Sequence, residues 1–240
     1  ASQLLGRPMQ RRFKADAQLQ ATLPLLQERI PQTDASFAHT TELSEGHLIS
    51  SLPETPMRVY ATPNTPSPEV QLLSNGRYHV MVTNAGGGYS RWKDLAVTRW
   101  REDTTRDHWG SFCYLRDLAS GDFWSTAYQP TLVPPDSFEA IFSEGRAEFR
   151  RRDQGIDAYT EIAVSPEDDI ELRRVCITNA GPTQREIEVT AYAELVLGRQ
   201  GDDIAHPAFA KLFVETEYLA EQGVILATRR KRGPEDPDIW

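Results

Sequence analysis

The sequence predicts an all-β domain, an antiparallel super-sandwich of two sheets with short helices at its N-terminal end. Apolar residues alternate with a period of two through most of the chain after residue 69, and turn-forming residues separate these stretches. Between them lies no amphipathic helical stretch of the length that parallel βαβ units need. The length of 240 residues fits, because all-β sandwiches reach roughly 200–250 residues as single units.

Residues 1–35 are expected to form a helical linker. Its apolar residues recur at spacings of four, three and four, which places them on one face of a helix: Leu19, Leu23, Leu26 and Ile30. Pro24 has no N–H donor and therefore divides this segment into two short helices. Residues 36–68 carry five prolines and little periodicity, which predicts an extended connector.

Residues 69–240 are predicted to form the β-sandwich. Asn75-Gly76 lies between two alternating stretches, and because this dipeptide tolerates the positive φ of a type I′ turn, we expect a hairpin there. The stretch 185–197 alternates with little interruption and predicts one long, half-buried strand. Further strands are expected at 95–100, 111–117, 123–128, 138–142, 147–152, 156–164, 170–179 and 223–230.

Charge and composition exclude several classes of partner. With 26 basic and 35 acidic residues, the formal net charge of −9 opposes binding to nucleic acid. No apolar stretch approaches the roughly 18 residues that span a bilayer, so we expect no direct membrane insertion and a cytoplasmic location. Cys113 and Cys176 lie far apart, and both thiols are expected to be buried.

No pattern in the sequence marks a catalytic centre. Gly86-Gly87-Gly88 is not followed by the Lys-Ser/Thr of a phosphate-binding loop and is expected to be a flexible, exposed turn. The five histidines lack metal-binding spacing, and no Gly-x-Ser-x-Gly nucleophile motif occurs. The sequence therefore predicts no catalytic residue, no metal and no cofactor.

Aromatic and basic residues concentrate between Tyr89 and Trp124, a window that holds four of the five tryptophans. A flat indole covers the apolar C–H face of a pyranose while polar side chains bond its hydroxyls, so this window predicts sugar binding. The alternative is that the tryptophans fill the core or pack on a neighbouring domain, and we favour the core for Trp124. The candidate substrate-binding residues are Tyr89, Ser90, Arg91, Trp92, Trp100, Arg101 and Trp109.

The same window resembles the N-terminal β-sandwich of glycoside hydrolase family 94, formerly glycosyltransferase family 36, which includes cellobiose and chitobiose phosphorylases. The resemblance is carried by Asn84-Ala85-Gly86-Gly87-Gly88-Tyr89-Ser90-Arg91-Trp92, Thr98-Arg99-Trp100, Tyr114-Leu115-Arg116-Asp117 and Gly121-Asp122-Phe123-Trp124-Ser125. The resemblance also includes Leu25–Pro31 upstream and His206–Phe209 and Leu212–Tyr218 downstream, so it covers nearly the whole chain. It is strongest for the phosphorylase-like region of cyclic β-1,2-glucan synthases.

The resemblance implies a galactose-mutarotase-like super-sandwich that is joined by linker helices to an (α/α)6 barrel. In this family the general acid and the phosphate-binding groups lie in the barrel, so the resemblance assigns no catalytic role to these 240 residues. It implies a parent glycosyltransferase or glycoside phosphorylase that acts on β-glucans and is associated with the inner membrane. The expected partners are a β-glucan oligosaccharide, the catalytic barrel of the same parent chain and a second copy in a homodimer.

The sequence leaves three functional hypotheses open. The first is a non-catalytic, carbohydrate-associated domain of a larger β-glucan-processing enzyme, which packs on the barrel and contacts glucan. The second is a purely structural module for dimerisation or interdomain packing, without sugar affinity. The third is an independent enzyme such as an epimerase, which the absence of a recognisable acid/base pair disfavours.

Overall fold

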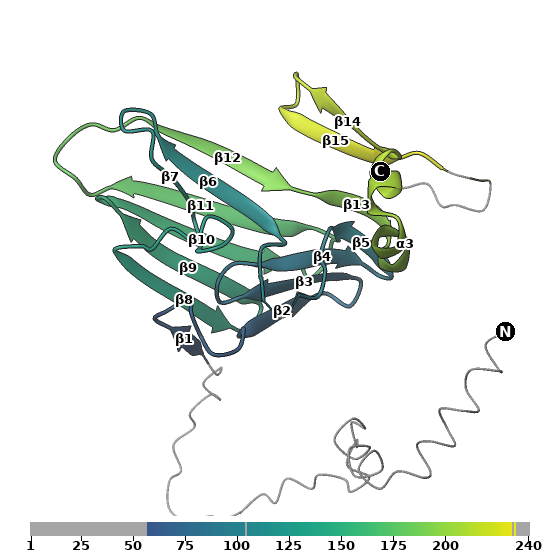
Figure 1. Ribbon diagram of the computed structural model, residues 1–240, viewed down its shortest axis with the longest axis horizontal. Helices are drawn as coiled ribbons and strands as arrows, with labels where there is room; N and C mark the ends of the chain where they lie inside the picture. Colours follow the sequence, from purple (N-terminus) through teal and green to yellow (C-terminus); the bar gives the residue numbers. More distant parts are fainter. Residues whose placement is uncertain (1–56, 104, 232, 234–240) are drawn as a thin grey trace, which may run out of the picture. The chain divides into compact units, whose positions relative to one another are not determined.

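Figure 1 shows the computed structural model of the chain, which describes residues 57–103, 105–231 and 233. The chain divides into two units, residues 1–52 and residues 53–240, and the described residues belong to the second. The helices predicted within residues 1–35 lie outside the described residues. The helices that are described run for only six and five residues, and neither could span a bilayer.

The largest layer is a five-stranded antiparallel sheet in the order β1-β8-β9-β10-β11 (Figure 1). The strands β8, β9 and β10 follow one another through tight turns. At Gln154-Gly155 both turn residues have positive φ, 49° and 82°, as a type I′ turn requires. The strands predicted in this sheet are confirmed. The bounds are β1 Arg58–Tyr60, β8 Ser137–Ser143, β9 Arg146–Asp153, β10 Ile156–Val164 and β11 Glu171–Asn179.

Two further antiparallel sheets have the orders β13-β5-β4-β3-β2 and β12-β6-β7. The first comprises β2 Val70–Ser74, β3 Tyr78–Thr83, β4 Gly88–Trp92, β5 Leu95–Thr98 and β13 Leu195–Arg199. The second comprises β6 Ser111–Asp117, β7 Phe123–Ser125 and β12 Ile187–Ala193. After β13 follow the helices α3 Gln200–Ala205 and α4 Pro207–Lys211 and a hairpin of β14 Val214–Leu219 and β15 Val224–Arg229.

Two clusters of buried side chains hold the layers together. One joins β2 and β3 to β8, β9 and β10, and its largest side chains are Phe142 and Phe149. The other joins β6 and β7 to β10 through Leu115, Trp124 and Ile156. Trp124 is 2% exposed, so its predicted place in the core is confirmed. The large sheet is thus packed against the two smaller ones, and the predicted antiparallel super-sandwich is confirmed.

The hairpin at Asn75-Gly76 is confirmed, but its turn is not the predicted type I′. Gly76 has a φ of 89°, whereas the φ of Asn75 is not positive. The Asn75 side chain instead accepts hydrogen bonds from the backbone N–H groups of Arg77 and Tyr78, at 2.9 and 2.8 Å. The asparagine therefore stabilises the turn through its side chain rather than through a left-handed backbone.

The prediction of a flexible, exposed turn at Gly86–Gly88 is wrong. All three glycines are buried, and Gly88 begins β4, a central strand between β3 and β5. A Cβ atom on Gly88 would lie 1.9 Å from the carbonyl oxygen of Met81, and one on Gly87 would lie 2.1 Å from the Asp107 carboxylate. The glycines are therefore needed for close packing of the backbone and not for mobility.

The prediction of a single long strand at 185–197 is also wrong. This segment divides at Glu194 into β12, which pairs with β6, and β13, which pairs with β5 in another sheet. A register shift between Leu195 and Gly198 and a φ of 50° at Leu197 accompany the change of sheet. β12 is not half-buried either, because Val189 and Tyr192 are 52% and 46% exposed.

Other elements were not predicted from the sequence. Strand β1 lies within the predicted connector and pairs with β8, and strand β14 and the helices α3 and α4 were not expected. Cys113 is half-buried, and burial raises the pKa of its thiol, but Cys176 is exposed on β11, so the expectation of two buried thiols is wrong.

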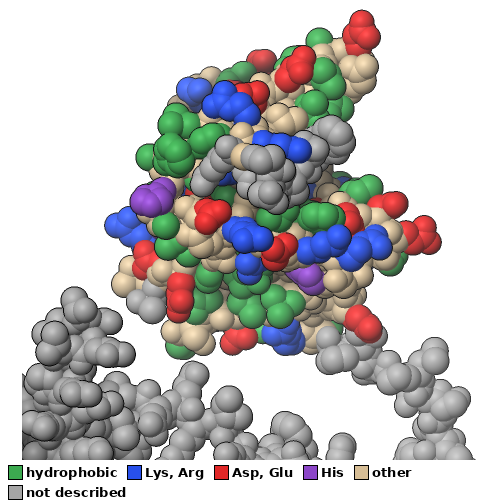
Figure 2. All heavy atoms as spheres, turned by 90° about the vertical axis from the view of Figure 1, so that its right-hand side faces the viewer, with side chains coloured by type: hydrophobic (Ala, Val, Ile, Leu, Met, Phe, Trp, Pro, Cys, Tyr) green, Lys and Arg blue, Asp and Glu red, His purple; other side chains and the backbone are tan. Residues whose placement is uncertain are grey.

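The face that carries α3, β14 and β15 mixes hydrophobic, basic and acidic side chains (Figure 2).

Candidate functional site: an aromatic cleft

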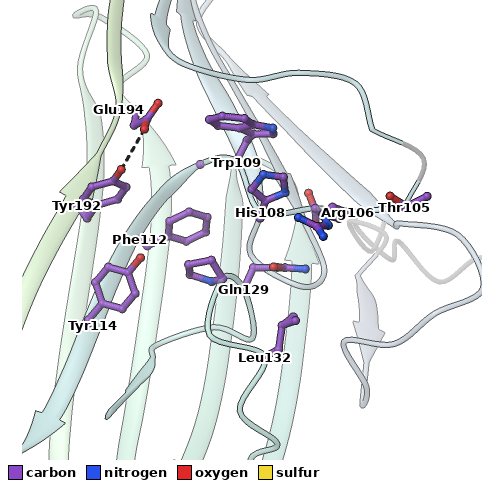
Figure 3. Close-up of a pocket in the computed structure, with 13 residues that line it drawn as sticks. Thr105, Arg106, His108, Trp109, Phe112, Tyr114, Gln129, Leu132, Tyr192 and Glu194 are labelled. Carbon is purple, nitrogen blue, oxygen red and sulfur yellow. Dashed lines mark hydrogen bonds between the residues drawn. The ribbon is translucent and has the colours of Figure 1, made fainter. Parts of the chain in front are cut away.

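A cavity of about 650 Å³ opens beside β6 and β12 (Figure 3). We call it the aromatic cleft. Its size falls within the range of roughly 300–1,000 Å³ that is typical of small-molecule sites. The cleft is lined by residues 105–110, Phe112 and Tyr114 of β6, the segment Gln129, Pro130 and Leu132, and Tyr192 and Glu194 at the end of β12.

Strand pairing brings the aromatic rings of one wall together. Phe112 and Tyr114 are two residues apart on β6 and therefore point to the same side, while Phe112 lies opposite Tyr192 on β12. The ring centroids of Tyr114 and Tyr192 are 6.3 Å apart, and those of Phe112 and Tyr114 are 6.5 Å apart. Figure 3 shows these rings on one side of the cleft, with His108 and Trp109 beyond Phe112.

The polar groups of this wall are hydroxyls beside a carboxylate. The Tyr192 hydroxyl donates a hydrogen bond of 3.3 Å to Glu194, which also forms ion pairs with Arg99 at 2.8 Å and Lys211 at 3.5 Å. Burial and the Glu194 carboxylate raise the pKa of Tyr192, and burial raises the pKa of Tyr114. Both phenols are therefore neutral at pH 7 and can donate hydrogen bonds.

The opposite wall is a loop that is fastened to the turn before β4. The Asp107 carboxylate accepts a hydrogen bond from the Thr83 hydroxyl, and the backbone N–H of Gly88 donates one of 2.7 Å to the carbonyl of Trp109. Burial raises the pKa of Asp107. The ring centroids of His108 and Trp109 are 4.9 Å apart. The buried Nδ1 of His108 has no hydrogen-bond partner among the described residues.

A buried ion pair supports the loop from below. The guanidinium of Arg99 donates two hydrogen bonds to the Asp203 carboxylate of α3, at 3.0 and 2.6 Å, and both side chains are 4% exposed. Arg101 lies 3.7 Å from the same carboxylate and 5.8 Å from the centroid of the Trp109 ring. This pairing fixes the end of β5, from which the loop departs, against α3.

Only one of the seven sequence-predicted contact residues, Trp109, lines the aromatic cleft. Trp100 and Arg101 line a neighbouring hollow of about 400 Å³. Tyr89 and Arg91 border a space of about 10 Å³, which is too small for a sugar, and the Tyr89 ring packs edge-on against Trp100 at 5.6 Å.

The side chains of Ser90 and Trp92 on β4 form hydrogen bonds within the protein. Ser90 is 1% exposed, and its hydroxyl donates a hydrogen bond of 2.5 Å to Glu171. The indole N–H of Trp92 donates one of 2.6 Å to Asp169, and the ammonium of Lys93 lies 4.1 Å from the centroid of the Trp92 ring. The structure therefore places Arg101 near Trp109 and beside Trp100 in the neighbouring hollow, and it leaves Ser90 and Trp92 outside both cavities.

Sequence reasoning missed Phe112, Tyr114, Gln129, Tyr192 and Glu194, which line the aromatic cleft together with the loop 105–110. The spacing of Phe112 and Tyr114 shows that they share a face, but nothing in the sequence indicates that β12 pairs with β6 and places Tyr192 beside them. Among the described residues, no group of three or more His, Cys, Asp and Glu side chains could hold a metal ion.

Comparison with known proteins agrees with the fold. Residues 53–240 match the glycosyl hydrolase 94 supersandwich domain. The chain is 40% identical over 230 residues to the cyclic β-(1,2)-glucan synthase NdvB of Rhizobium meliloti (strain 1021), which covers 95% of the chain and 8% of that protein.

Two phosphorylases are more distant relatives. The chain is 28% identical over 165 residues to the N,N′-diacetylchitobiose phosphorylase of Vibrio furnissii, which covers 67% of the chain and 21% of the relative. It is 27% identical over 188 residues to the solabiose phosphorylase of Paenibacillus borealis, covering 76% and 24%. The chain thus spans less than a quarter of the length of each of these relatives. Because residues 53–240 match the supersandwich domain of glycosyl hydrolase 94, the chain belongs to this family.

Proposed function

We propose that this chain is a non-catalytic supersandwich domain of a larger β-glucan-processing enzyme and that its aromatic cleft contacts the glucan. The observation that carries the proposal is the position of Trp109, a half-buried indole at the wall of a cavity of about 650 Å³. The identity of 40% with a protein named as a cyclic β-(1,2)-glucan synthase supports a β-1,2-glucan as the ligand.

The chemistry of the cleft suits a sugar. Indole and phenol rings cover the apolar C–H face of a pyranose, and neutral phenol hydroxyls donate to its oxygens. Trp109, Tyr114 and Tyr192 supply the rings, while the Gln129 amide supplies a further hydrogen-bonding group.

The state of the carboxylates supports binding rather than catalysis. Glycoside cleavage uses one carboxylic acid and one carboxylate that flank the scissile bond. In the cleft Glu194 is held by Arg99, Lys211 and Tyr192, and Asp107 is held by Thr83. Both groups are thus committed to structural contacts. We propose that the catalytic groups lie in an (α/α)6 barrel of the parent enzyme, on which this domain packs, and that the parent is associated with the inner membrane.

Isothermal titration of the 240-residue chain with β-1,2-glucans tests the proposal, with cellulose-derived oligosaccharides as the linkage control. We expect saturable binding that Trp109→Ala and, separately, Tyr192→Ala each weaken at least tenfold. The matched control is Trp92→Ala, because Trp92 is also half-buried but lies outside the cleft. The absence of heat at millimolar glucan, or a loss of binding in Trp92→Ala alone, would overturn the proposal.

A second candidate is a packing or dimerisation module without sugar affinity. It is favoured by large apolar side chains that are exposed on edge strands: Leu172 on β11 is 58% exposed, Val189 on β12 is 52% exposed and Ile225 on β15 is 70% exposed. Exposed apolar patches on sheet edges mark interaction surfaces. Concentration-dependent self-association that Leu172→Asp and Val189→Asp abolish, together with no response to glucan, would establish this function instead.

A further inference from the structure

A second hollow of about 400 Å³ adjoins the aromatic cleft. Its lining includes Pro63, Pro66 and Pro68 together with Trp100, Arg101 and Glu102, and we call it the proline-side hollow. Thr105, Arg106, Asp107 and Gln129 line both cavities. The loop that ends at Trp109 therefore forms a ridge between two neighbouring cavities and not the outer rim of one.

The ridge carries polar groups without protein partners. Among the described residues, the guanidinium of Arg106 and the side-chain amide of Gln129 form no hydrogen bond or ion pair with another side chain, and Figure 3 shows both beside the aromatic cleft. The buried Nε of Arg101 and Nδ1 of His108 also have no partner there, one in a residue of each cavity. Buried polar groups are nearly always hydrogen-bonded, so a ligand is the natural partner for Nε of Arg101 and Nδ1 of His108. Arg106 is exposed and Gln129 is half-buried, so their side chains are accessible to the same ligand.

The charges around the proline-side hollow indicate a neutral ligand. Arg101 and Arg106 are opposed by Glu102, Asp103 and Asp107, so the charges nearly cancel and a phosphate finds no excess of positive charge. Hydroxyl groups satisfy donors and carboxylates equally well, because each hydroxyl can both donate and accept. Trp100 offers an indole in this hollow, as Trp109 does in the cleft.

We infer that the aromatic cleft and the proline-side hollow form one bipartite site, in which a neutral oligosaccharide crosses the ridge of Arg106 and Gln129. This inference rests on the proposed function and adds a length requirement to it. A short oligosaccharide occupies the aromatic cleft alone. A longer one occupies both cavities, and the second contact is made at the high effective concentration of a tethered ligand, which raises the overall affinity.

The test is a titration of the 240-residue chain with purified β-1,2-gluco-oligosaccharides of increasing length. We expect the affinity to rise on the order of 10²-fold once the ligand spans both cavities, and then to level off. Glu102→Ala and Trp100→Ala should each lower the ratio of long-ligand to short-ligand affinity toward one. Glu102 is exposed, so its replacement leaves the fold intact even if that of Trp100 does not. Glu188→Ala removes an exposed acid outside both cavities and is the control for the same change in surface charge.

The outcomes separate the two proposals. Binding whose affinity does not depend on ligand length, or a ratio that Glu102→Ala and Trp100→Ala leave unchanged, overturns the bipartite site and retains glucan binding in the cleft. The absence of binding at every length overturns the proposed function as well. A rise with length that Glu188→Ala abolishes equally would show that general surface charge carries the effect, and it would also overturn the bipartite site.

Discussion

The Asp107 carboxylate accepts a hydrogen bond from the Thr83 hydroxyl, which in turn accepts one of 3.0 Å from the backbone N–H of Gly87. This pair of contacts joins the loop that carries His108 and Trp109 to the turn before β4. The same loop separates the aromatic cleft from the proline-side hollow. The shape of both cavities therefore depends on a contact between residues that are 24 positions apart.

The first prediction concerns the pH dependence of this contact. Burial raises the pKa of Asp107 above the ordinary value of about 3.9 for an aspartate. Between that value and the raised pKa, the folded chain binds more protons at this site than the unfolded chain does. The contribution of Asp107 to the free energy of unfolding is therefore fully present below about pH 3.9 and is lost as the pH rises through the raised pKa.

Asp107→Asn removes this titration while keeping an acceptor for Thr83. Urea unfolding of both proteins at a series of pH values from about 4 upward should show that the wild-type free energy of unfolding, taken relative to that of the variant, falls as the pH rises. The comparison cancels the contributions of Asp157 and Asp169, whose pKa values are lowered by hydrogen bonds from Arg152 and Trp92. A relative stability that increases with pH would contradict the prediction.

The second prediction concerns Gly87. A Cβ atom at this position would lie 2.1 Å from Oδ1 and 2.6 Å from the backbone oxygen of Asp107, so the loop must move to accommodate it. We expect Gly87→Ala to lower the free energy of unfolding by about 1–3 kcal/mol, as overpacking does, and to weaken glucan binding. Urea unfolding and glucan titration measure the two effects.

Gly201 provides the control for this substitution. It lies in α3, and apart from its chain neighbours and the backbone of its own helix no heavy atom lies within 4 Å of the position that its Cβ would take. Gly201→Ala should leave the free energy of unfolding unchanged or raise it by up to about 1 kcal/mol, because alanine restricts the unfolded chain. If Gly87→Ala behaved like Gly201→Ala, the close approach of Asp107 to Gly87 would not be a constraint on the loop.

Period-two alternation was sufficient to locate most strands because it records which side chains face a core. It failed at Gly88–Trp92, where glycines that permit close backbone contact have the same composition as a flexible turn. It also failed at Glu194, because the alternation continues unbroken while the chain leaves one sheet for another. The change of sheet depends on partners far away in the sequence.

The candidate site was predictable only where its residues lie close together in the sequence. Trp109 was predicted because it belongs to the aromatic segment, and Trp100 and Arg101 of the same segment line the neighbouring hollow. Tyr192, by contrast, reaches the cleft only through the pairing of β12 with β6. Ser90 was selected because of its neighbours, yet it points into the protein toward Glu171. Whether the contact residues bind glucan stays a prediction.

The third prediction concerns the pairing of Arg99 with Asp203 beneath the loop. Removing one partner of a buried ion pair leaves an uncompensated charge, which costs about 3–5 kcal/mol. Asp203→Ala should lower the free energy of unfolding toward the smaller end of that range, because Glu194 remains 2.8 Å from Arg99. The exposed pair of Arg230 and Glu215 is the control, and Glu215→Ala should change stability by less than about 1 kcal/mol. Equal effects in urea unfolding would contradict the prediction.

The fourth prediction separates the tryptophans by their surroundings. Trp124 is 2% exposed within the cluster that joins β6 and β7 to β10, so Trp124→Ala should lower the free energy of unfolding by about 3–5 kcal/mol. Trp92 is half-buried and keeps one hydrogen bond to Asp169, so Trp92→Ala should cost about 1 kcal/mol. Urea unfolding measures both values. A larger loss for Trp92 than for Trp124 would mean that the end of β4, and not the β6–β7–β10 cluster, limits the stability of the sandwich.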